Sequence, residues 1–451
     1  MIELNEHSEE LVENIAAPSI AQQTRIQRTL AHRLQLEWLS GNRLHIRSGS
    51  HVGVATLPGG ITIRVHPKIA GGTLGVLTMF ALSSGARLDE LEGLTRTVDF
   101  ERNSDTVELM CRLLSTGARA VLSSGPICDY RSTTDDLEYI RGRLDFRRQS
   151  LIHFNRLERL ACVFDEYDHD IVENRLILQG LIRARRLCRN DETRAKLIRL
   201  ISEFKSFAIQ TKEHLVGEEI DYDRRNLHYR PAHIWARAIL DNRSFMDAPA
   251  VDNYSLGTFM IDMNKLFEAF VEWFVAASVA GTTAKLTRQQ KNFANLRVDR
   301  SRSRALTPDI VLRREEQRLA VDAKYKNTAV NDLGMSDVYQ LLTYAQIYRG
   351  FGSIPMAMVV LPSLQASPQT SMTELSLRGA EGRETLTRVE AFGLPLPELV
   401  SDLSKSSDVM LKVFAAEFRS KARLQTEIVP SVCTSTHALK LDSMMPGSRA
   451  R

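Results

Sequence analysis

The sequence has few of the features that mark secreted, disulfide-rich or membrane proteins. It contains five cysteines, an odd number without a C-x-x-C spacing, at positions 111, 128, 162, 188 and 433. This pattern argues against a disulfide framework or a zinc ribbon and favours a reducing compartment. No uninterrupted apolar run is long enough to cross a bilayer, and the acidic start lacks the apolar stretch of a signal peptide. We therefore expect a cytoplasmic protein without a membrane segment.

The chain also lacks a phosphate-binding loop and a strong net charge. No G-x-x-x-x-G-K-[ST] sequence is present, so nothing indicates that the chain itself cradles the phosphates of a nucleotide. The net charge of +4 is too small to identify a nucleic-acid binder, so the positions of the basic residues matter more than their total. With 451 residues, 43% of them hydrophobic, the chain can form about two or three domains with sizeable cores.

The most informative stretch is residues 306–326, which reads as a β-hairpin. Apolar residues alternate with others on both sides of a polar break at residues 313–318, and a period of two is typical of strands. If the strands fold back around the two glutamates of this break, antiparallel pairing places Asp309 opposite Asp322 on one face. Lys324 shares that face, whereas the alternating apolar residues point to the other face and can be buried against a helix.

This arrangement of charges predicts a metal-dependent nuclease site. Two carboxylates that face each other across a strand pair repel, which is costly unless a cation lies between them. Hard oxygen ligands suit Mg²⁺ or, alternatively, Mn²⁺. Lys324 could orient a metal-bound water or stabilise the charge that grows in the transition state. For these residues taken alone, a surface hairpin with scattered charges is the alternative.

The segments on either side of the hairpin have the order that a mixed α/β nuclease core needs. Residues 261–280 show helical spacing of apolar side chains and predict an amphipathic helix that leads into the hairpin. This helix could present Glu268 to the same metal. The near-continuous apolar run at residues 353–362 predicts a central strand that is buried on both faces.

A second helix is predicted at residues 336–350, between the hairpin and this strand. We expect Ser336 or Asp337 as its N-cap, and a glycine ends it. Gln340 and Tyr344 are one turn apart, so they lie on one face of the helix. A solvated position for Gln340 and a core position for Tyr344 are the alternatives to a role in the site.

With these residues in place, the sequence resembles the McrC family, the nuclease subunit of modification-dependent (5-methylcytosine) restriction systems. The family is built on a PD-(D/E)xK endonuclease fold. The residues that carry the resemblance are Pro308-Asp309, Asp322-Ala323-Lys324-Tyr325, Gln340, Tyr344 and Glu268, with further matches at residues 142–146 and 168–182. The likeness extends from about Leu74 to Leu399, with weaker support before it.

The resemblance implies a Mg²⁺-dependent DNA endonuclease subunit that works with, and stimulates, a GTP-hydrolysing AAA+ partner, McrB. GTP would act only through that partner. Asp309 and Asp322 would be the primary metal ligands, with Glu268 as a third acid acting on the metal or its water. Lys324 would be the electrostatic partner of the nucleophile or the scissile phosphate. Gln340 and Tyr344 would position DNA or orient the site.

The expected fold class is α/β (α+β overall), organised in sequence order. We expect a small β-rich N-terminal module at residues 1–72, around the turn signal Pro58-Gly59-Gly60, and a mostly helical partner-docking region at residues 73–250. A PD-(D/E)xK nuclease domain with a mixed sheet would follow at residues 251–425, with a closing helix from Ser406, and a disordered tail at residues 426–451. The N-terminal module could be purely structural, or it could contact the motor subunit or DNA.

Basic residues gather in two segments. The run between the first nuclease helix and the hairpin is assigned to DNA phosphate contacts, with an exposed charged loop as the alternative; its residues are Lys291, Arg297, Arg300, Arg302 and Arg304. Residues 173–207, predicted to form one or two helices joined near Asp191, also carry many arginines. There a solvated helix face is favoured over a DNA-tracking surface.

Two other functions fit parts of the same pattern. A RecB-like DNA exonuclease shares the acid, D-x-K and Q-x-x-x-Y logic, although the version with an iron–sulfur cluster needs several cysteines after the nuclease motifs and only one lies there. A non-catalytic DNA clamp that assembles with and stimulates a GTPase is the alternative without enzymatic activity. The intact set of acids and lysine argues against the clamp.

Overall fold

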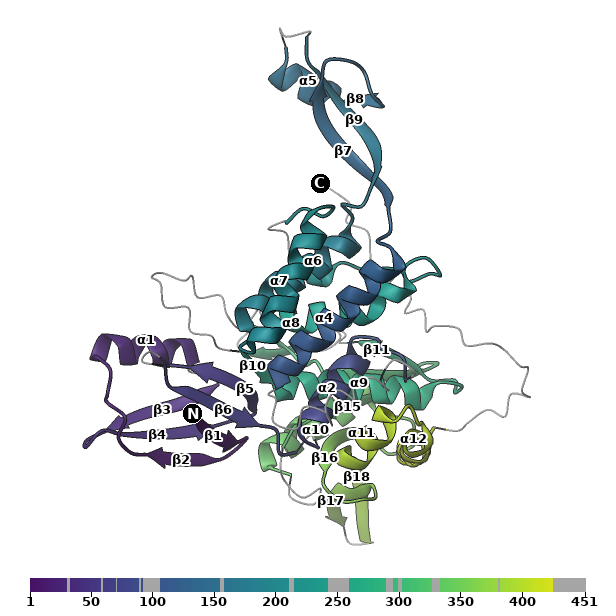
Figure 1. The fold of residues 1–451 in the computed structure, drawn as a ribbon. Helices are drawn as coiled ribbons and strands as arrows, with labels where there is room; N and C mark the ends of the chain where they lie inside the picture. The colour runs from purple at the N-terminus through teal and green to yellow at the C-terminus, as the bar shows by residue number, and fades with distance from the viewer. Residues whose placement is uncertain are drawn as a thin grey trace.

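The computed structural model describes residues 1–30, 33–57, 60–69, 71–88, 91, 106–154, 158–210, 215–241, 259–288, 295–298, 302–326, 333–379 and 382–424. Figure 1 shows a β-rich N-terminal module, a bundle of helices from which a long β arm projects, and a C-terminal body of sheet and helices. The expected α+β class with a mixed C-terminal sheet is confirmed. None of the helices described is both long enough and apolar enough to pass through a membrane. The boundary predicted at residue 250 and the tail predicted at 426–451 lie outside the described residues.

The N-terminal module contains two small sheets. One has the order β1-β6-β5-β10 and the other β2-β4-β3, with bounds β1 (Ile2–Asn5), β2 (Glu9–Val12), β3 (Leu34–Leu39), β4 (Arg43–Ser48), β5 (His51–Thr56), β6 (Thr62–His66) and β10 (Phe259–Asp262). Helix α1 (Ile20–Leu30) contributes Ile26 and Leu30 to a core of its own with Leu44 and Ile46. Strands β5 and β6 pair antiparallel, as the glycine-rich turn between them predicts.

Strand β10 connects the module to the rest of the chain. It comes from far along the sequence and pairs antiparallel with β5, with Phe259 opposite Val54 and Asp262 opposite His51. Gly53 is required at this crossing, because a Cβ there would lie 2.2 Å from the carbonyl oxygen of Phe259. The chain therefore runs from the N-terminal sheet directly into helix α9 (Met263–Val279).

The middle region is built from packed helices, as predicted. The helices are α2 (Gly72–Ser83), α4 (Thr106–Ser124), α6 (Val172–Leu187), α7 (Asp191–Lys205) and α8 (Arg230–Asp241), with 3-10 turns η2 (Leu215–Gly217) and η3 (Leu227–Tyr229). Two glycines let α8 pack closely against α4 and α6. A Cβ on Gly117 of α4 would lie 2.9 Å from Ala232 of α8, and one on Gly180 of α6 would lie 2.7 Å from Ala236 of α8.

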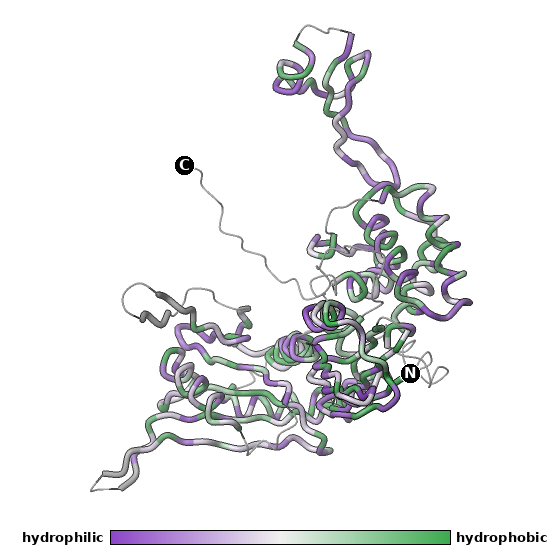
Figure 2. Tube along the Cα trace, turned by 90° about the vertical axis from the view of Figure 1, so that its left-hand side faces the viewer, coloured by the Kyte–Doolittle hydropathy of each residue, from purple (hydrophilic) through white to green (hydrophobic). Residues whose placement is uncertain are grey.

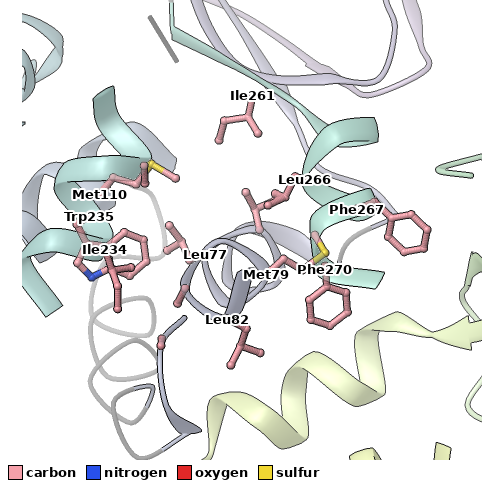
Figure 3. Close-up of a cluster of buried hydrophobic side chains, with 14 of the residues drawn as sticks. Leu77, Met79, Leu82, Met110, Ile234, Trp235, Ile261, Leu266, Phe267 and Phe270 are labelled. Carbon is pink, nitrogen blue, oxygen red and sulfur yellow. The ribbon is translucent and has the colours of Figure 1, made fainter. Parts of the chain in front are cut away.

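Helix α2 joins this bundle to the C-terminal body. In Figure 3, Leu77 lies on the side of Ile234 and Trp235 of α8, whereas Met79 lies beside Phe270 of α9. Both sides belong to one continuous cluster of buried apolar side chains. Figure 2 shows that hydrophobic stretches, drawn in green, alternate with hydrophilic ones along the helical turns. The helical region and the C-terminal body therefore share a core.

The projecting arm is a β element of this region that was not predicted from the sequence. Strands β7 (Asp129–Leu137) and β9 (Leu160–Asp168) form a long antiparallel ribbon that carries β8 (Arg143–Leu144) and helix α5 (Phe146–Ile152). The burial pattern of β7 contains no fully buried residue. Because β7 has no fully buried residue, its sequence shows no apolar alternation from which this strand could be predicted.

The C-terminal sheet has the order β11-β14-β15-β16-β18-β17. Its bounds are β11 (Lys285–Arg288), β14 (Ile310–Arg314), β15 (Gln317–Ala323), β16 (Met356–Ser363), β17 (Gln369–Gly379) and β18 (Gly382–Pro395), and a separate hairpin is formed by β12 (Asn295–Val298) and β13 (Arg302–Ala305). Strands β15, β16 and β18 run parallel, whereas the other pairs are antiparallel. Strand β16 is buried along its whole length, which confirms the predicted central strand.

Helices cover both faces of this sheet. On one face Ile310 and Val321 join the cluster that contains Phe270 and Phe274 of α9. On the other face Val311 and Ala320 pack with residues of α10 (Met335–Tyr348), including Leu341. Helices α11 (Leu396–Ser404) and α12 (Val409–Lys421) follow the last strand and bury Phe418 against Phe274.

Two expected helix boundaries were wrong. Gly334 is the N-cap of α10, so Ser336 and Asp337 lie within its first turn rather than capping it. The carboxylate of Asp337 instead accepts a hydrogen bond from Lys326, which explains why it does not turn back onto the helix end. The closing helix begins at Val409, three residues later than expected from Ser406.

Candidate active site

The predicted hairpin forms with the predicted register. Strands β14 and β15 pair antiparallel with Ile310 opposite Val321, so Asp309 and Asp322, the next residues outward, meet at the same end. Glu315 in the turn has a left-handed φ of 53°, which lets the chain reverse over two residues. The backbone N–H of Ala323 donates to Oδ2 of Asp309 at 2.8 Å. Strand pairing and this hydrogen bond therefore fix the first aspartate beside the second.

Lys324 lies against Asp322. Its Nζ is 2.7 Å from Oδ2 of Asp322, a residue that is only 2% exposed. The backbone N–H of Lys324 donates to the carbonyl oxygen of Val360 at 3.0 Å, which continues the pairing of β15 with the central strand by one more residue. The lysine is therefore held at the edge of the sheet with its ammonium group on the buried carboxylate.

The site carries more negative than positive charge. The pKa of Asp309 is raised to about 7. Burial is the largest cause and the charges of Asp322 and Glu268 add to it, whereas the hydrogen bond from Ala323 and the charge of Lys324 act to lower this pKa. Burial acts to lower the pKa of Lys324, but the neighbouring Asp322 outweighs it, so that this pKa is raised. The charges of Asp322 and Glu268 both act on Asp309, and Lys324 is the cation beside them, so a further cation would be stabilised here.

The donor set fits a hard divalent cation that keeps several of its waters. Within the described ranges no three His, Cys, Asp or Glu side chains come together as a ready-made metal cage. The structure instead brings together the two aspartates, and Glu268 acts on Asp309 through its charge. Mg²⁺ is usually held by one or two carboxylates and retains waters, so this pair of buried carboxylates suits it.

Helix α10 holds the segment that precedes Asp309. The hydroxyl of Tyr344 donates to the carbonyl oxygen of Thr307 at 3.0 Å, and Nε2 of Gln340 donates to the same hydroxyl at 2.9 Å. Tyr344 is buried, and burial raises its pKa. Of the two roles that we considered for Gln340 and Tyr344, this geometry supports orientation of the site.

The predicted phosphate-contacting residues are only partly described. Lys291 and Arg300 lie outside the described residues. Arg297 is on β12, and Arg302 and Arg304 are on β13, which pairs antiparallel with β12. The role of all five residues in phosphate contact stays a prediction.

Sequence reasoning missed one residue pair beside this site. Tyr325 follows Lys324, and its hydroxyl donates to the carboxylate of Glu6 in the N-terminal module at 3.0 Å. Tyr325 was noted only as part of the motif, and Glu6 was not singled out. No local pattern could have revealed the pair, because 319 positions separate the two residues.

A comparison with protein families identifies one family. Residues 46–351 match the family model described as "McrBC 5-methylcytosine restriction system component". No curated protein matches this chain.

Among solved structures, the chain is similar to one in the refined half-complex from the tetradecameric assembly of Thermococcus gammatolerans McrB AAA+ hexamers with bound McrC. The TM-score is 0.55 and the identity 17%, over 93% of this chain and 99% of that chain, so this likeness concerns the fold. A second similarity is to a chain in the cryo-EM structure of the Thermococcus gammatolerans McrBC complex, with a TM-score of 0.38 and 18% identity over 62% of this chain and 88% of that chain. A TM-score this low is too weak to compare folds.

Proposed function

The chain belongs to the family of McrBC 5-methylcytosine restriction system components, and we propose that it is the DNA-cleaving subunit of such a system. It is a Mg²⁺-dependent endonuclease that hydrolyses phosphodiester bonds in DNA containing 5-methylcytosine. It does so when coupled to a GTP-hydrolysing AAA+ partner of the McrB kind, which it stimulates. The observation that carries the proposal is the meeting of Asp309, Asp322 and Lys324 at one end of the hairpin.

Each charged residue of the site has its own role in the proposed reaction. Asp309 and Asp322 would hold Mg²⁺, or Mn²⁺ in its place. When bound, the ion lowers the pKa of a water and neutralises charge on a phosphate oxygen. Lys324 donates to the attacking water or to the scissile phosphate, and its contact with Asp322 aims it there. Glu268 adds a third negative charge that orients the water.

Other residues keep this arrangement rigid. Tyr344, supported by Gln340, holds the carbonyl of Thr307 and so the segment that carries Asp309. Helix α9 packs under the hairpin and brings Glu268 to it. A site fixed by strands and packed helices loses little entropy when the transition state forms.

The arm supports the proposal of a protein partner. Several large apolar side chains on its outer part are exposed: Tyr139, Ile140, Phe146, Leu151, Ile152 and Phe154. Figure 1 shows that this part of the arm stands away from the helical bundle. Exposed apolar groups gathered in one place mark interaction sites. We therefore assign the arm to the partner-docking region, and GTP acts through that partner because the chain lacks a phosphate-binding loop.

DNA would be held by the basic segment that leads into the hairpin. This segment contains the β12–β13 hairpin and the residues proposed for phosphate contact, Lys291, Arg297, Arg300, Arg302 and Arg304. Because β13 ends only a few residues before Asp309, phosphates bound there would lie close to the carboxylates. Contacts of this kind make binding strongly dependent on salt. In the described part of the chain no cysteine forms a disulfide, which supports a cytoplasmic location.

The test is cleavage of methylated DNA by the assembly reconstituted with an McrB-type partner, GTP and Mg²⁺. Asp309→Ala and Asp322→Ala are expected to abolish cleavage while they leave stimulation of the GTPase intact. Unchanged restriction by both variants would instead support a non-catalytic clamp. A covalently closed circular substrate separates the remaining alternative, because a RecB-like exonuclease cannot start on DNA without an end.

A further inference from the structure

Glu6 is a buried carboxylate for which the proposed mechanism has no role. It follows β1 and is 1% exposed. Its Oε1 accepts hydrogen bonds from the backbone N–H groups of Lys68 and Ile69, both at 2.6 Å. These donors come from the turn after β6, so the N-terminal module itself fixes the position of the carboxylate. A charge removed from water in this way is costly unless its partners are well placed.

The remaining partner of Glu6 belongs to the proposed nuclease site. The hydroxyl of Tyr325 lies 3.0 Å from both carboxylate oxygens of Glu6. Burial, together with the charge of Glu6, raises the pKa of Tyr325, so the phenol stays protonated and donates. Tyr325 is the residue directly after Lys324 and is 3% exposed.

Tyr325 also contacts the helix that carries Glu268. Its ring centroid lies 5.6 Å from that of Phe267, the residue directly before Glu268 on α9. One side chain therefore meets three elements: the end of β15, helix α9 and the N-terminal module. The contact therefore joins the sequence neighbour of Lys324, which is Tyr325, to the sequence neighbour of Glu268, which is Phe267.

The chain leaves the sheet at this point, so its path depends on such anchors. Lys324 makes the last backbone hydrogen bond to β16, and two residues later Lys326 pairs with Asp337 of α10. Tyr325 is the anchor between them. Without the hydrogen bond from its hydroxyl to Glu6, Tyr325 would lose its polar contact with the N-terminal module.

We propose that Glu6 is a positioning residue of the nuclease site: by holding Tyr325 it fixes the end of β15, and with it Lys324, so that cleavage requires a docked N-terminal module. This inference rests on the proposed function of the site. It gives the module an indirect role in DNA cleavage, through the contact of Glu6 with Tyr325. A pair of apolar side chains would join the N-terminal module to the nuclease site at a lower desolvation cost than Glu6 and Tyr325 do. A buried carboxylate that accepts a hydrogen bond also fixes the orientation of its partner, which is what a positioning role requires.

The experiment compares Tyr325→Phe, Glu6→Ala and Glu6→Gln in the assembly with an McrB-type partner, GTP, Mg²⁺ and methylated DNA. Tyr325→Phe keeps the ring on Phe267 and removes only the hydroxyl. It should lower kcat for cleavage on the order of tenfold to hundredfold, because small displacements of a catalytic group have effects of this size. KM for DNA and stimulation of the partner's GTPase should not change. Glu6→Ala should show the same loss, and Glu6→Gln should restore most of the rate because its amide oxygen still accepts from Tyr325.

Two control variants separate positioning from a general loss of stability. Tyr229→Phe also removes a fully buried hydroxyl with two partners, the backbone N–H of Ile127 and Asn174, but in the helical region. It should lower Tm about as much as Tyr325→Phe and leave kcat unchanged. Glu3→Gln alters an exposed carboxylate on β1, which pairs with Arg64, and should change neither quantity.

The outcomes are distinct. A normal kcat in Tyr325→Phe and Glu6→Ala, measured well below their Tm, would overturn the inference, as would failure of Glu6→Gln to cleave better than Glu6→Ala. Asp309→Ala in the same assay reports on the proposed function itself. If Asp309→Ala is inactive while both positioning variants cleave normally, only the inference fails; if Asp309→Ala cleaves normally, the proposed nuclease site fails as well.

Discussion

Oδ2 of Asp309 accepts a hydrogen bond from the backbone N–H of Ala323 at 2.8 Å. Ala323 is the middle residue of the D-x-K sequence, with Asp322 on one side and Lys324 on the other. The carboxylate from one strand is therefore tied to the very residue that separates the two charged groups of the next strand. This contact makes the spacing of the three charged side chains a property of the backbone rather than of flexible rotamers.

Replacement of Asp309 by Asn is expected to abolish cleavage and to stabilise the metal-free protein. The pKa of Asp309 is raised to about 7 in the folded protein, chiefly by burial, whereas it is about 3.9 in the unfolded chain. Between these two values only the unfolded chain is ionised, so the free energy of unfolding falls as pH rises through this range. Asn removes that charge and can still accept from Ala323, so at pH 8 the unfolding free energy should rise by roughly 1 to 3 kcal/mol. Chemical denaturation with EDTA present measures this. Glu316→Gln, at the exposed turn of the same hairpin, is the control and should change neither property.

Divalent cations are expected to stabilise the wild-type protein through the two aspartates. Mg²⁺ at one hundred times its Kd should add about 2.7 kcal/mol to the unfolding free energy, and EDTA should remove this increment. Asp309→Asn and Asp322→Asn should show little or none of it. Tm measured against Mg²⁺ concentration checks the prediction, and an equal Mg²⁺ response in wild type and both variants would contradict it.

Changes on the outer part of the arm are expected to weaken partner binding without weakening the fold. Phe146 and Phe154 are 74% and 79% exposed, so Phe146→Ser and Phe154→Ser should alter the unfolding free energy by no more than about 0.5 kcal/mol. Loss of an aromatic anchor at an interface costs about 2 kcal/mol, which corresponds to roughly a thirtyfold rise in Kd for the AAA+ partner. Titration calorimetry measures Kd, and Ile198→Ser, at an exposed position of α7, serves as the control. Unchanged affinity in both arm variants would remove the arm from the interface.

Acidification is expected to destabilise the helical region through His233. This side chain is fully buried between the hydroxyl of Tyr222 and the carbonyl of Glu173. Burial lowers its pKa to about 3 from a value near 6.5 in the unfolded chain. The unfolded state therefore binds the extra proton between these values, and stability is lost as pH falls below 6.5, by about 1.4 kcal/mol per pH unit. The unfolding free energy of His233→Gln should depend less steeply on pH than that of the wild type, by about one proton between pH 6 and 4.5. Denaturation at several pH values measures this slope, and identical slopes in the two proteins would show that His233 does not titrate as described.

The hairpin that carries the site could be predicted from the sequence because its determinants are local. Alternating apolar residues fix the two strands, the polar break fixes the turn, and the register of Ile310 with Val321 follows from both. The buried strand β16 and the helices around it follow from equally local periodicities. The position of Asp309 beside Asp322 could therefore be expected from the spacing of residues along the chain.

The arm and the start of α10 could not be predicted in the same way. Strand β7 of the arm has no fully buried position, so its sequence has no apolar alternation that would predict a strand. The start of α10 was misplaced because Asp337, a residue type that favours caps, is drawn to Lys326 instead. In both cases the structure depends on a contact with solvent or with a side chain outside the element, and the residues next to it in the sequence do not indicate that contact.

By itself, then, the sequence determined which residues meet within the hairpin of the site and within the helices around it, since short-range spacing dictates those contacts. Only the tertiary structure decided that β10 completes the N-terminal sheet, that α2 bridges two bodies, and that Glu6 receives the hydroxyl of Tyr325. The physical reason is that burial of a common core selects these partners from positions hundreds of residues apart. Such a choice depends on the whole set of surfaces to be buried and leaves no periodic trace along the chain.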